Sequence, residues 1–190
     1  NLFLNYHTKL KYETLDKRYF PTKGLKTNIS YTIYTNLHTN TAYSSLAAQV
    51  TKIFPITLNT FIIPTIYGRF IFNDGIPFMY SNVIGGEGYN PHYEQQIPFS
   101  GLTHTESTLK LLGNAQIQVR HKFHEKQYLT LSGNYAIHQN QFSNFLQGKK
   151  IYGTSIGYGY DSPLGPIEGF ICYSNRTNKL GFYLNIGFGF

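Results

Sequence analysis

The chain has 190 residues, enough for one domain or one barrel, and it carries a formal net charge of +7. Its basic residues are scattered and form no run, so no nucleic-acid partner is expected. No apolar stretch approaches the length of about 18 residues that a membrane-spanning helix needs, which excludes such a helix. The single cysteine, Cys172, excludes an internal disulfide and a zinc site built from cysteines.

Apolar and polar residues alternate in ten runs, and this period of two predicts an all-β fold of about ten strands. The runs cover residues 4–15, 24–36, 45–56, 60–72, 78–84, 112–123, 127–138, 150–160, 165–174 and 179–190. The predicted tight turns are 124–126, 161–164 and 175–178, and the longer polar connections are 37–44 and 139–149. A much longer excursion covers about 73–111. Short turns on one side and long loops on the other are typical of outer-membrane barrels.

The two faces of the runs also favour a transmembrane antiparallel β-barrel, with apolar residues toward lipid and small polar residues toward a lumen. The residues expected to face lipid are Ile117, Val119, Leu129, Leu131, Ile156, Leu184 and Ile186. Those expected to face the lumen are Gln116, Gln118, Asn134, Ser155 and Asn185. The alternative is a soluble β-sandwich, whose inner face is bulky and whose outer face is charged.

Three motifs in the right order resemble the barrel-assembly-machinery superfamily of outer-membrane proteins, also called bacterial surface antigens. The first is a strand–turn–strand signature in YETLDKRYFPTKGLKTNISY (12–31), with Asp16, Tyr19, Phe20, Pro21 and Gly24 at the matching positions. The second is IGGEGYNPHYEQQIPFSG (84–101), which resembles the opening of the family's lumen-directed loop through Gly85, Gly86, Gly88 and Tyr89. The loop departs from the family pattern because it has no Arg-Gly-aromatic tip, and the nearest match is Glu87-Gly88-Tyr89.

The third motif is the end of the chain, 160–190, which resembles the family's three closing strands. Alternating residues of the last strand resemble the signal that the outer-membrane assembly machinery reads: Phe182, Leu184, Ile186, Phe188 and Phe190. The segments HYEQQIPFSG and YSNRTNKLGFYLNIGFGF are most similar to the patatin-like phospholipases of Bacteroidetes-type bacteria.

This resemblance implies that residues 1–190 are the C-terminal part of a sixteen-stranded barrel in the outer membrane of a Gram-negative bacterium. The barrel would anchor an N-terminal patatin-like lipase domain, with translocation or tethering of that domain as further roles. The implied partners are outer-membrane lipid and the assembly machinery. The alternative is a self-contained small barrel that acts as a pore or as a membrane enzyme with loop-borne residues.

Closure of the barrel has three solutions, because an unpaired strand edge crossing a bilayer is not viable. The missing strands lie upstream of Asn1, the ten strands close on themselves, or a second chain completes the wall. We favour the first solution, because the excursion at 73–111 would crowd a ten-stranded lumen.

No catalytic, cofactor or metal site is expected, so this chain is not expected to be an enzyme. GTSIG (153–157) matches a nucleophile motif, but Ser155 lies within a predicted strand rather than at a strained turn. The seven histidines lack the spacing of metal ligands. The charged residues of the predicted lumen face are Lys9, Lys11, Arg69, Arg120 and Lys122 with Glu13 and Glu168. These would either favour anions or, as we prefer, form ion pairs with the long loop and across strands.

Overall fold

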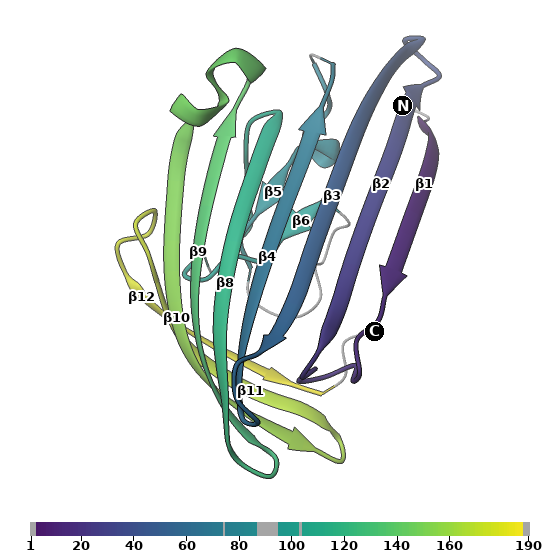
Figure 1. Cartoon of the computed structure of the whole chain (residues 1–190). Helices are drawn as coiled ribbons and strands as arrows, with labels where there is room; N and C mark the ends of the chain where they lie inside the picture. The colour runs from purple at the N-terminus through teal and green to yellow at the C-terminus, as the bar shows by residue number, and fades with distance from the viewer. Residues whose placement is uncertain (1–2, 74, 87–94, 103, 188–190) are drawn as a thin grey trace.

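The computed structural model describes residues 3–73, 75–86, 95–102 and 104–187. Nine antiparallel strands form one curved sheet, in the order β1-β2-β3-β4-β8-β9-β10-β11-β12 (Figure 1). The strands are β1 (Phe3–Glu13), β2 (Gly24–Asn36), β3 (Thr41–Pro55), β4 (Thr60–Ile71), β8 (Leu111–His124), β9 (Gln127–Gln139), β10 (Lys149–Ser162), β11 (Gly165–Ser174) and β12 (Leu180–Ile186). Each strand pairs with its neighbour in this list, so the predicted antiparallel all-β fold is confirmed.

The side chains alternate between a convex outer face and a concave inner face, as the period of two predicts. On the outer face Ile117 is 53% exposed and Leu131 is 57% exposed, whereas Asn134 on the inner face is 4% exposed. Val119, Leu129, Ile156, Leu184 and Ile186 are also exposed on the outer face. Gln116, Gln118, Ser155 and Asn185 lie on the inner face, buried or half-buried.

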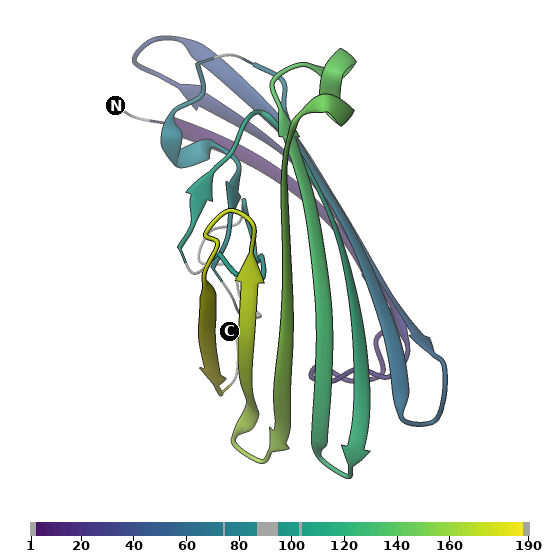
Figure 2. The same ribbon diagram turned by 90° about the vertical axis from the view of Figure 1, so that its left-hand side faces the viewer.

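The uncovered outer face is too apolar for a protein surrounded by water, because soluble monomers rarely expose large contiguous apolar patches. A sandwich would cover one face of the sheet with a second sheet. The second sheet in the described part of the chain has only three two-residue strands, and it lies on the inner face (Figure 2). The β-sandwich alternative therefore does not fit the structure.

The sheet is open, because β1 and β12 form its two edges and do not pair with each other. It also has nine strands where ten runs were predicted. The run at 78–84 is not a strand of the wall; it forms η1 (Phe78–Tyr80) and the short strand β5 (Val83–Ile84) inside the long loop. Alternation alone gave a wrong prediction for this run. A period of two indicates an extended backbone, but it does not indicate which strand that backbone pairs with.

The connections lie at two ends of the sheet, which we call the turn end and the loop end (Figure 1). The turn end holds the β1–β2 connection and the short connections 56–59, 125–126 and 163–164. The loop end holds the connections 37–40, 72–110, 140–148 and 175–179. The tight turn predicted at 175–178 thus lies with the long loops, because it joins β11 to β12 and strand direction alternates.

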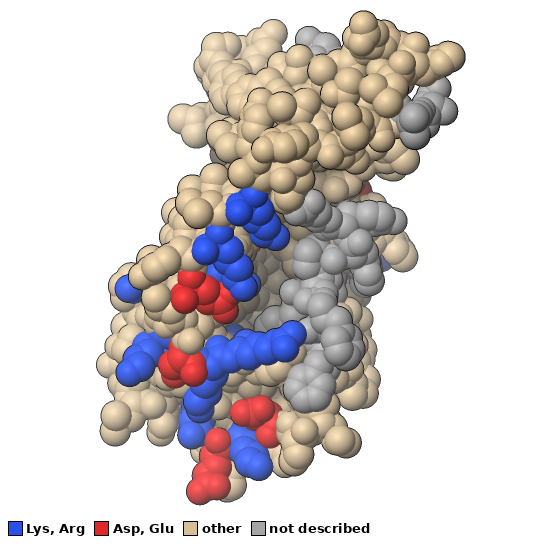
Figure 3. Space-filling view, turned by 90° about the vertical axis from the view of Figure 1, so that its right-hand side faces the viewer, with Lys and Arg blue, Asp and Glu red and all other residues tan. Residues whose placement is uncertain are grey.

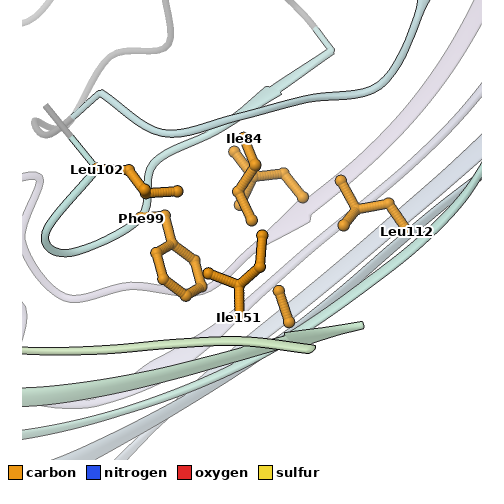
Figure 4. Packing of buried hydrophobic residues seen from close by; sticks show 7 residues of the cluster. Ile84, Phe99, Leu102, Leu112 and Ile151 are labelled. Atoms are coloured by element: carbon orange, nitrogen blue, oxygen red, sulfur yellow. The ribbon is translucent and has the colours of Figure 1, made fainter. Parts of the chain in front are cut away.

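The long loop, residues 72–110, folds back against the inner face and builds a small sheet of β5, β6 (Gln96–Ile97) and β7 (Glu106–Ser107). Figure 4 shows Ile84, Phe99 and Leu102 of the loop pointing toward Leu112 and Ile151 of the wall. These side chains, with Ile97 and Ala136, form a buried core. Burial stabilises the docked loop by about 1.5–3 kcal/mol for each large side chain.

The second helical segment, η2 (Phe142–Gln147), lies at the loop end of the sheet (Figure 1). Its Phe142 and Phe145 rings contact Phe70 of β4, with ring centroids 5.5 and 6.3 Å away. Within the described ranges, no helix has the length and apolar character needed to cross a membrane.

Candidate functional site: the inner face of the sheet

A buried arginine attaches both ends of the long loop to the wall. Arg69 of β4 is 3% exposed, and its Nη1 donates to Asn82 Oδ1 at 2.6 Å and to the Tyr80 carbonyl at 3.3 Å. Asn82 in turn donates through Nδ2 to the carbonyls of Leu109 and Lys110, both at 2.8 Å. We call Arg69 and Asn82 the loop brace, since together they hold the beginning and the end of the loop against β4.

A cluster of hydroxyl groups fixes the middle of the loop. Ser100 of the loop lies 3.2 Å from the Ser155 hydroxyl of β10, which lies 2.5 Å from that of Ser132 on β9. Asn134 donates to Ser100 Oγ at 2.9 Å. All four side chains are buried. Hydrogen bonding among them offsets part of the cost of burying these polar groups.

Small residues on the inner face of β10 make room for this contact. A methyl group at Gly153 would lie 2.1 Å from the carbonyl oxygen of Ser100, and one at Gly157 would lie 2.2 Å from the Phe170 ring. A methyl group at Gly159 would lie 2.8 Å from the Phe20 ring. The GTSIG segment therefore serves close packing.

The β1–β2 connection, residues 14–23, is folded by Asp16. The Asp16 carboxylate accepts hydrogen bonds from the Thr22 hydroxyl at 2.5 Å, the Thr22 N–H at 2.8 Å and the Lys23 N–H at 3.2 Å. Burial alone would raise the pKa of Asp16, but these hydrogen bonds outweigh it and hold the pKa below its ordinary value. Gly24 ends the connection with φ of +123°, and a methyl group there would lie 2.5 Å from the Thr14 carbonyl oxygen.

Phe20 packs this connection against the inner face of the sheet. Its ring stacks on Tyr128 of β9 with centroids 4.3 Å apart and planes 4° apart, and it is 2% exposed. The guanidinium carbon of Arg120 lies 5.4 Å from the Phe20 ring centroid. The neighbouring Tyr19 is half-buried, as is Pro21. The sequence placed these aromatic-Pro residues in a turn, and a contact with β9 was not predicted.

A cavity of about 570 Å³ lies on the inner face, between the strands of the wall and residues 96–100 of the long loop. Its lining is mostly neutral and polar, including Asn28, Gln49, Asn114, Gln116 and Gln118. Lys9 and Lys26 line it from the β1 side, and Glu168 lines it from β11. Figure 3, viewed from the β1 side, shows that charged residues on this face gather in the part nearer the turn end.

The contacts of the charged residues on the inner face differ from the predicted ion pairing with the long loop and across strands. Lys11 pairs with Glu13 at 2.5 Å, but both residues lie on the same strand, β1. Arg69 does reach the long loop, but its acceptors are neutral groups, so ion pairing is the wrong description for it. Arg120 is 4% exposed and contacts an aromatic ring.

The structure places the remaining predicted site residues as follows. Gly85 and Gly86 have φ of +106° and +70°, and their N–H groups donate to the carbonyls of Ile97 and Leu102. Phe182 is exposed on the outer face of β12, together with Leu184 and Ile186. Gly88, Tyr89, Phe188 and Phe190 lie outside the described residues, as does Glu87.

Nothing in the described part of the chain groups residues for acyl transfer or metal binding. The Ser155 hydroxyl is hydrogen bonded to Ser100 and Ser132, and neither of these side chains is a base. No group of three or more His, Cys, Asp or Glu residues among the described positions could hold a metal ion. The Cys172 side chain is 2% exposed and lies on the inner face of β11, opposite Ser155 of β10.

In a comparison with known families, the chain matches the family described as the OMP85 superfamily over residues 1–190. No curated protein matches the chain.

Proposed function

Because the chain belongs to the OMP85 superfamily, a group of outer-membrane β-barrel proteins of Gram-negative bacteria, we propose that it anchors a patatin-like lipase domain in that membrane. In this proposal residues 1–190 are the C-terminal part of the barrel, and the lipase domain precedes them in the same polypeptide. Translocation or tethering of that domain would be further roles of the same barrel.

The observation that carries this proposal is the open sheet with two unpaired edges, β1 and β12. In lipid, each unsatisfied backbone N–H or C=O group costs several kcal/mol, so both edges need partner strands. A sixteen-stranded barrel would need seven strands in addition to the nine described here. We propose that these strands precede β1, which keeps neighbouring strands adjacent in sequence, as they are throughout the described sheet.

The lipase part of the proposal is supported by sequence resemblance. The segments HYEQQIPFSG (92–101) and YSNRTNKLGFYLNIGFGF (173–190) are similar to the barrels of patatin-like phospholipases. The contact between Ser100 and Ser155 gives the described part of the first segment a structural role, because it joins the loop to β10. The second segment includes β12, whose exposed apolar face suits both lipid and the outer-membrane assembly machinery.

The test uses the whole polypeptide that carries this chain, expressed in a Gram-negative host with its own outer membrane. We expect esterase activity in the outer-membrane fraction and heat-modifiable migration of the detergent-extracted protein. Removing residues 1–190 should transfer the esterase activity to the soluble fraction. Activity that stays in the membrane after this deletion would contradict the anchoring role, and a polypeptide without esterase activity would contradict the lipase assignment.

The same preparation separates the possible ways of closing the barrel. A cysteine at Leu4 of β1 and one at Leu184 of β12 lie on opposite edges of the open sheet. If the nine strands closed on themselves, these cysteines would form a disulfide within one chain. The proposal expects no such bond, and expects each cysteine to be cross-linked instead to a strand that precedes β1.

A further inference from the structure

Side-chain amides form a row across the inner face of the sheet. Asn28 of β2, Gln49 of β3 and Asn114 of β8 lie in register, with Tyr67 of β4 between the last two. Adjacent strands are about 4.8 Å apart, so neighbouring side chains of such a row can contact the same small molecule. The next two inward positions of β8 also carry amides. We call the following residues the cavity amides, because all of them line the cavity of about 570 Å³: Asn28, Gln49, Asn114, Gln116 and Gln118.

The cavity amides have no hydrogen-bond partners within the described part of the chain. None of the hydrogen bonds between described residues involves the side chain of a cavity amide. Asn114 is 5% exposed and its Oδ1 is buried without a partner, as is Oδ1 of Asn28. A buried polar group without a partner destabilises a fold. A bound molecule that forms hydrogen bonds with the cavity amides would recover this lost stability.

The other polar groups between the long loop and the wall differ from the cavity amides. In the loop brace, Arg69 and Asn82 bond to each other and to carbonyls of the loop. The hydroxyl groups of Ser132 and Ser155 likewise bond to each other. Those side chains hold the protein together, whereas the cavity amides make no such contact. Their arrangement is therefore better explained by a ligand than by the stability of the fold.

The chemistry of the cavity amides indicates which ligand would fit. Each carboxamide offers an oxygen acceptor and two N–H donors, and a hydroxyl group both donates and accepts. The last torsion of an Asn or Gln side chain is broad, so either end of the amide can turn toward a ligand. A molecule with several adjacent hydroxyl groups and no charge matches such a set. We propose that the cavity amides form a binding site for a neutral sugar on the lumen side of the wall.

The rest of the cavity lining agrees with a sugar ligand. Tyr67 lies within the amide row, and Phe170 and Tyr183 also line the cavity. All three side chains are half-buried. The C–H groups of a sugar ring form an apolar face that packs against an aromatic ring, while its hydroxyl groups point to the amides. The cavity volume lies within the range of roughly 300–1,000 Å³ that small-molecule sites occupy.

The experiment uses the full-length protein, purified in a detergent that contains no sugar. Maltotriose and cellotriose are the probes, and binding is measured by saturation-transfer difference NMR of the sugar protons. We expect transfer to at least one of the two sugars. Its affinity should be the same at low and at high salt, because a neutral ligand gains nothing from Lys9 or Lys26. A glycolipid with a maltotriose head group is measured beside free maltotriose, and the tighter binder of the two identifies the source of the sugar.

The test variant is the double substitution Asn114→Leu with Gln116→Leu, which removes two amides and keeps side chains of similar size. We expect the sugar affinity to fall about tenfold, since two hydrogen bonds to the ligand are lost. The urea midpoint should not fall, because neither amide bonds to the described part of the protein. The matched control is Asn185→Leu, which removes an amide from the inner face of β12 outside the cavity, and we expect it to bind as the parent does.

Three results would overturn the proposal. Absence of transfer to both sugars would show that the cavity holds water alone. An unchanged affinity in the double variant, with heat-modifiable migration confirming that it is folded, would place the bound sugar elsewhere. A neutral peptide of Gly and Ser is the third probe. If it binds through the same two amides while the sugars do not, the ligand is a polypeptide.

Discussion

Single glycines decide how closely the long loop approaches the wall. On β10 the inward positions 153, 157 and 159 are all glycine, and a methyl group at any of them would collide with another part of the chain. Gly153 is the most restricted, because the obstacle is the backbone oxygen of Ser100 rather than a flexible side-chain tip. Replacing it must therefore move the loop.

We expect Gly153→Ala to destabilise the folded barrel by about 1–3 kcal/mol, the usual cost of forcing extra volume into a packed interface. The measurement is the folded fraction in a urea titration in lipid vesicles, read from heat-modifiable migration. The matched control is Gly133→Ala on β9, where the nearest atom to the new methyl group would lie 3.9 Å away. Equal urea midpoints for the two variants would contradict the close-packing role of Gly153.

Asp16 leads to a pH-dependent prediction at the same scale. Its pKa is lower in the folded state than the ordinary value of 3.8, so the charged carboxylate stabilises the fold. This stabilisation is fully present above the unfolded pKa and disappears as the pH falls through the folded pKa. We expect Asp16→Asn to lower the urea midpoint at pH 7, and we expect the difference from the parent to shrink below pH 3.8. A difference that persists unchanged in acid would show that the charge of Asp16 is not its cause.

At the scale of elements, the loop brace explains why a connection of this length can stay docked. Asn82 is fully buried and uses both ends of its amide, accepting from Arg69 and donating to the carbonyls of Leu109 and Lys110. Asn82 therefore holds the two ends of the loop next to each other, beside β4. Without the Asn82 side chain, the buried Arg69 guanidinium and the carbonyls of Leu109 and Lys110 would each lose a hydrogen bond.

We expect Asn82→Ala to lower the free energy of unfolding by about 1–3 kcal/mol and to make the loop sensitive to protease while the barrel stays folded. Limited proteolysis followed by mass spectrometry of the fragments would locate the cuts. Asn185→Ala is the control, because Asn185 lies on the inner face of β12 and no described hydrogen bond involves its side chain. Resistance of the loop in Asn82→Ala would mean that the apolar core alone holds it.

The wall strands could be predicted from sequence because their signal is local. Successive residues of β8 and β9 face lipid and the lumen in turn, and accordingly Gln118 is half-buried on the inner face whereas Leu129 is exposed on the outer face. The segment 78–84 has the same local pattern, but Arg69 and the β6 and β7 strands hold it inside the lumen. Such contacts join residues far apart in the chain, and no periodicity reports them.

For the inner face, the sequence predicted which residues face the lumen but not which residues they contact. Arg69, Arg120 and Ser155 were assigned to the lumen face correctly, yet their partners came from the loop and from the β1–β2 connection. The position of Phe20 was not predictable, because an aromatic residue in a turn usually indicates a local contact or a membrane interface. The glycines of β10 are a sequence signal of close packing, because a methyl group at Gly153, Gly157 or Gly159 would collide with another part of the chain.

For the whole molecule, we predict that assembly depends on the last strand. Phe182, Leu184 and Ile186 present an apolar face to lipid, and the sequence continues the alternation through Phe190. Our sequence-based prediction is that Phe190→Asp reduces the amount of barrel in the outer membrane far more than it reduces synthesis. A charge on the lipid side costs about 2–4 kcal/mol at the midplane and less at the interface, so most of the defect would come from lost recognition.

The comparison variant is Phe190→Leu, which keeps an apolar residue at the last position. Pulse-labelled synthesis and heat-modifiable migration of membrane protein, measured together, separate production from assembly. Normal membrane levels of Phe190→Asp would show that the last residue is not part of the assembly signal.

The docking of the long loop on β10 and β11 has a consequence for the order of folding. Ser100 and Gly101 contact Ser155 and the Tyr173 backbone, and Glu106 pairs with Arg176 at 3.0 Å. All three contacts join the loop to residues that follow it in the chain. The docking surface of the loop is therefore incomplete until the strands from β9 onward have paired. Seating of the loop is then a late step, and a protected loop is a sign that the C-terminal strands are already in place.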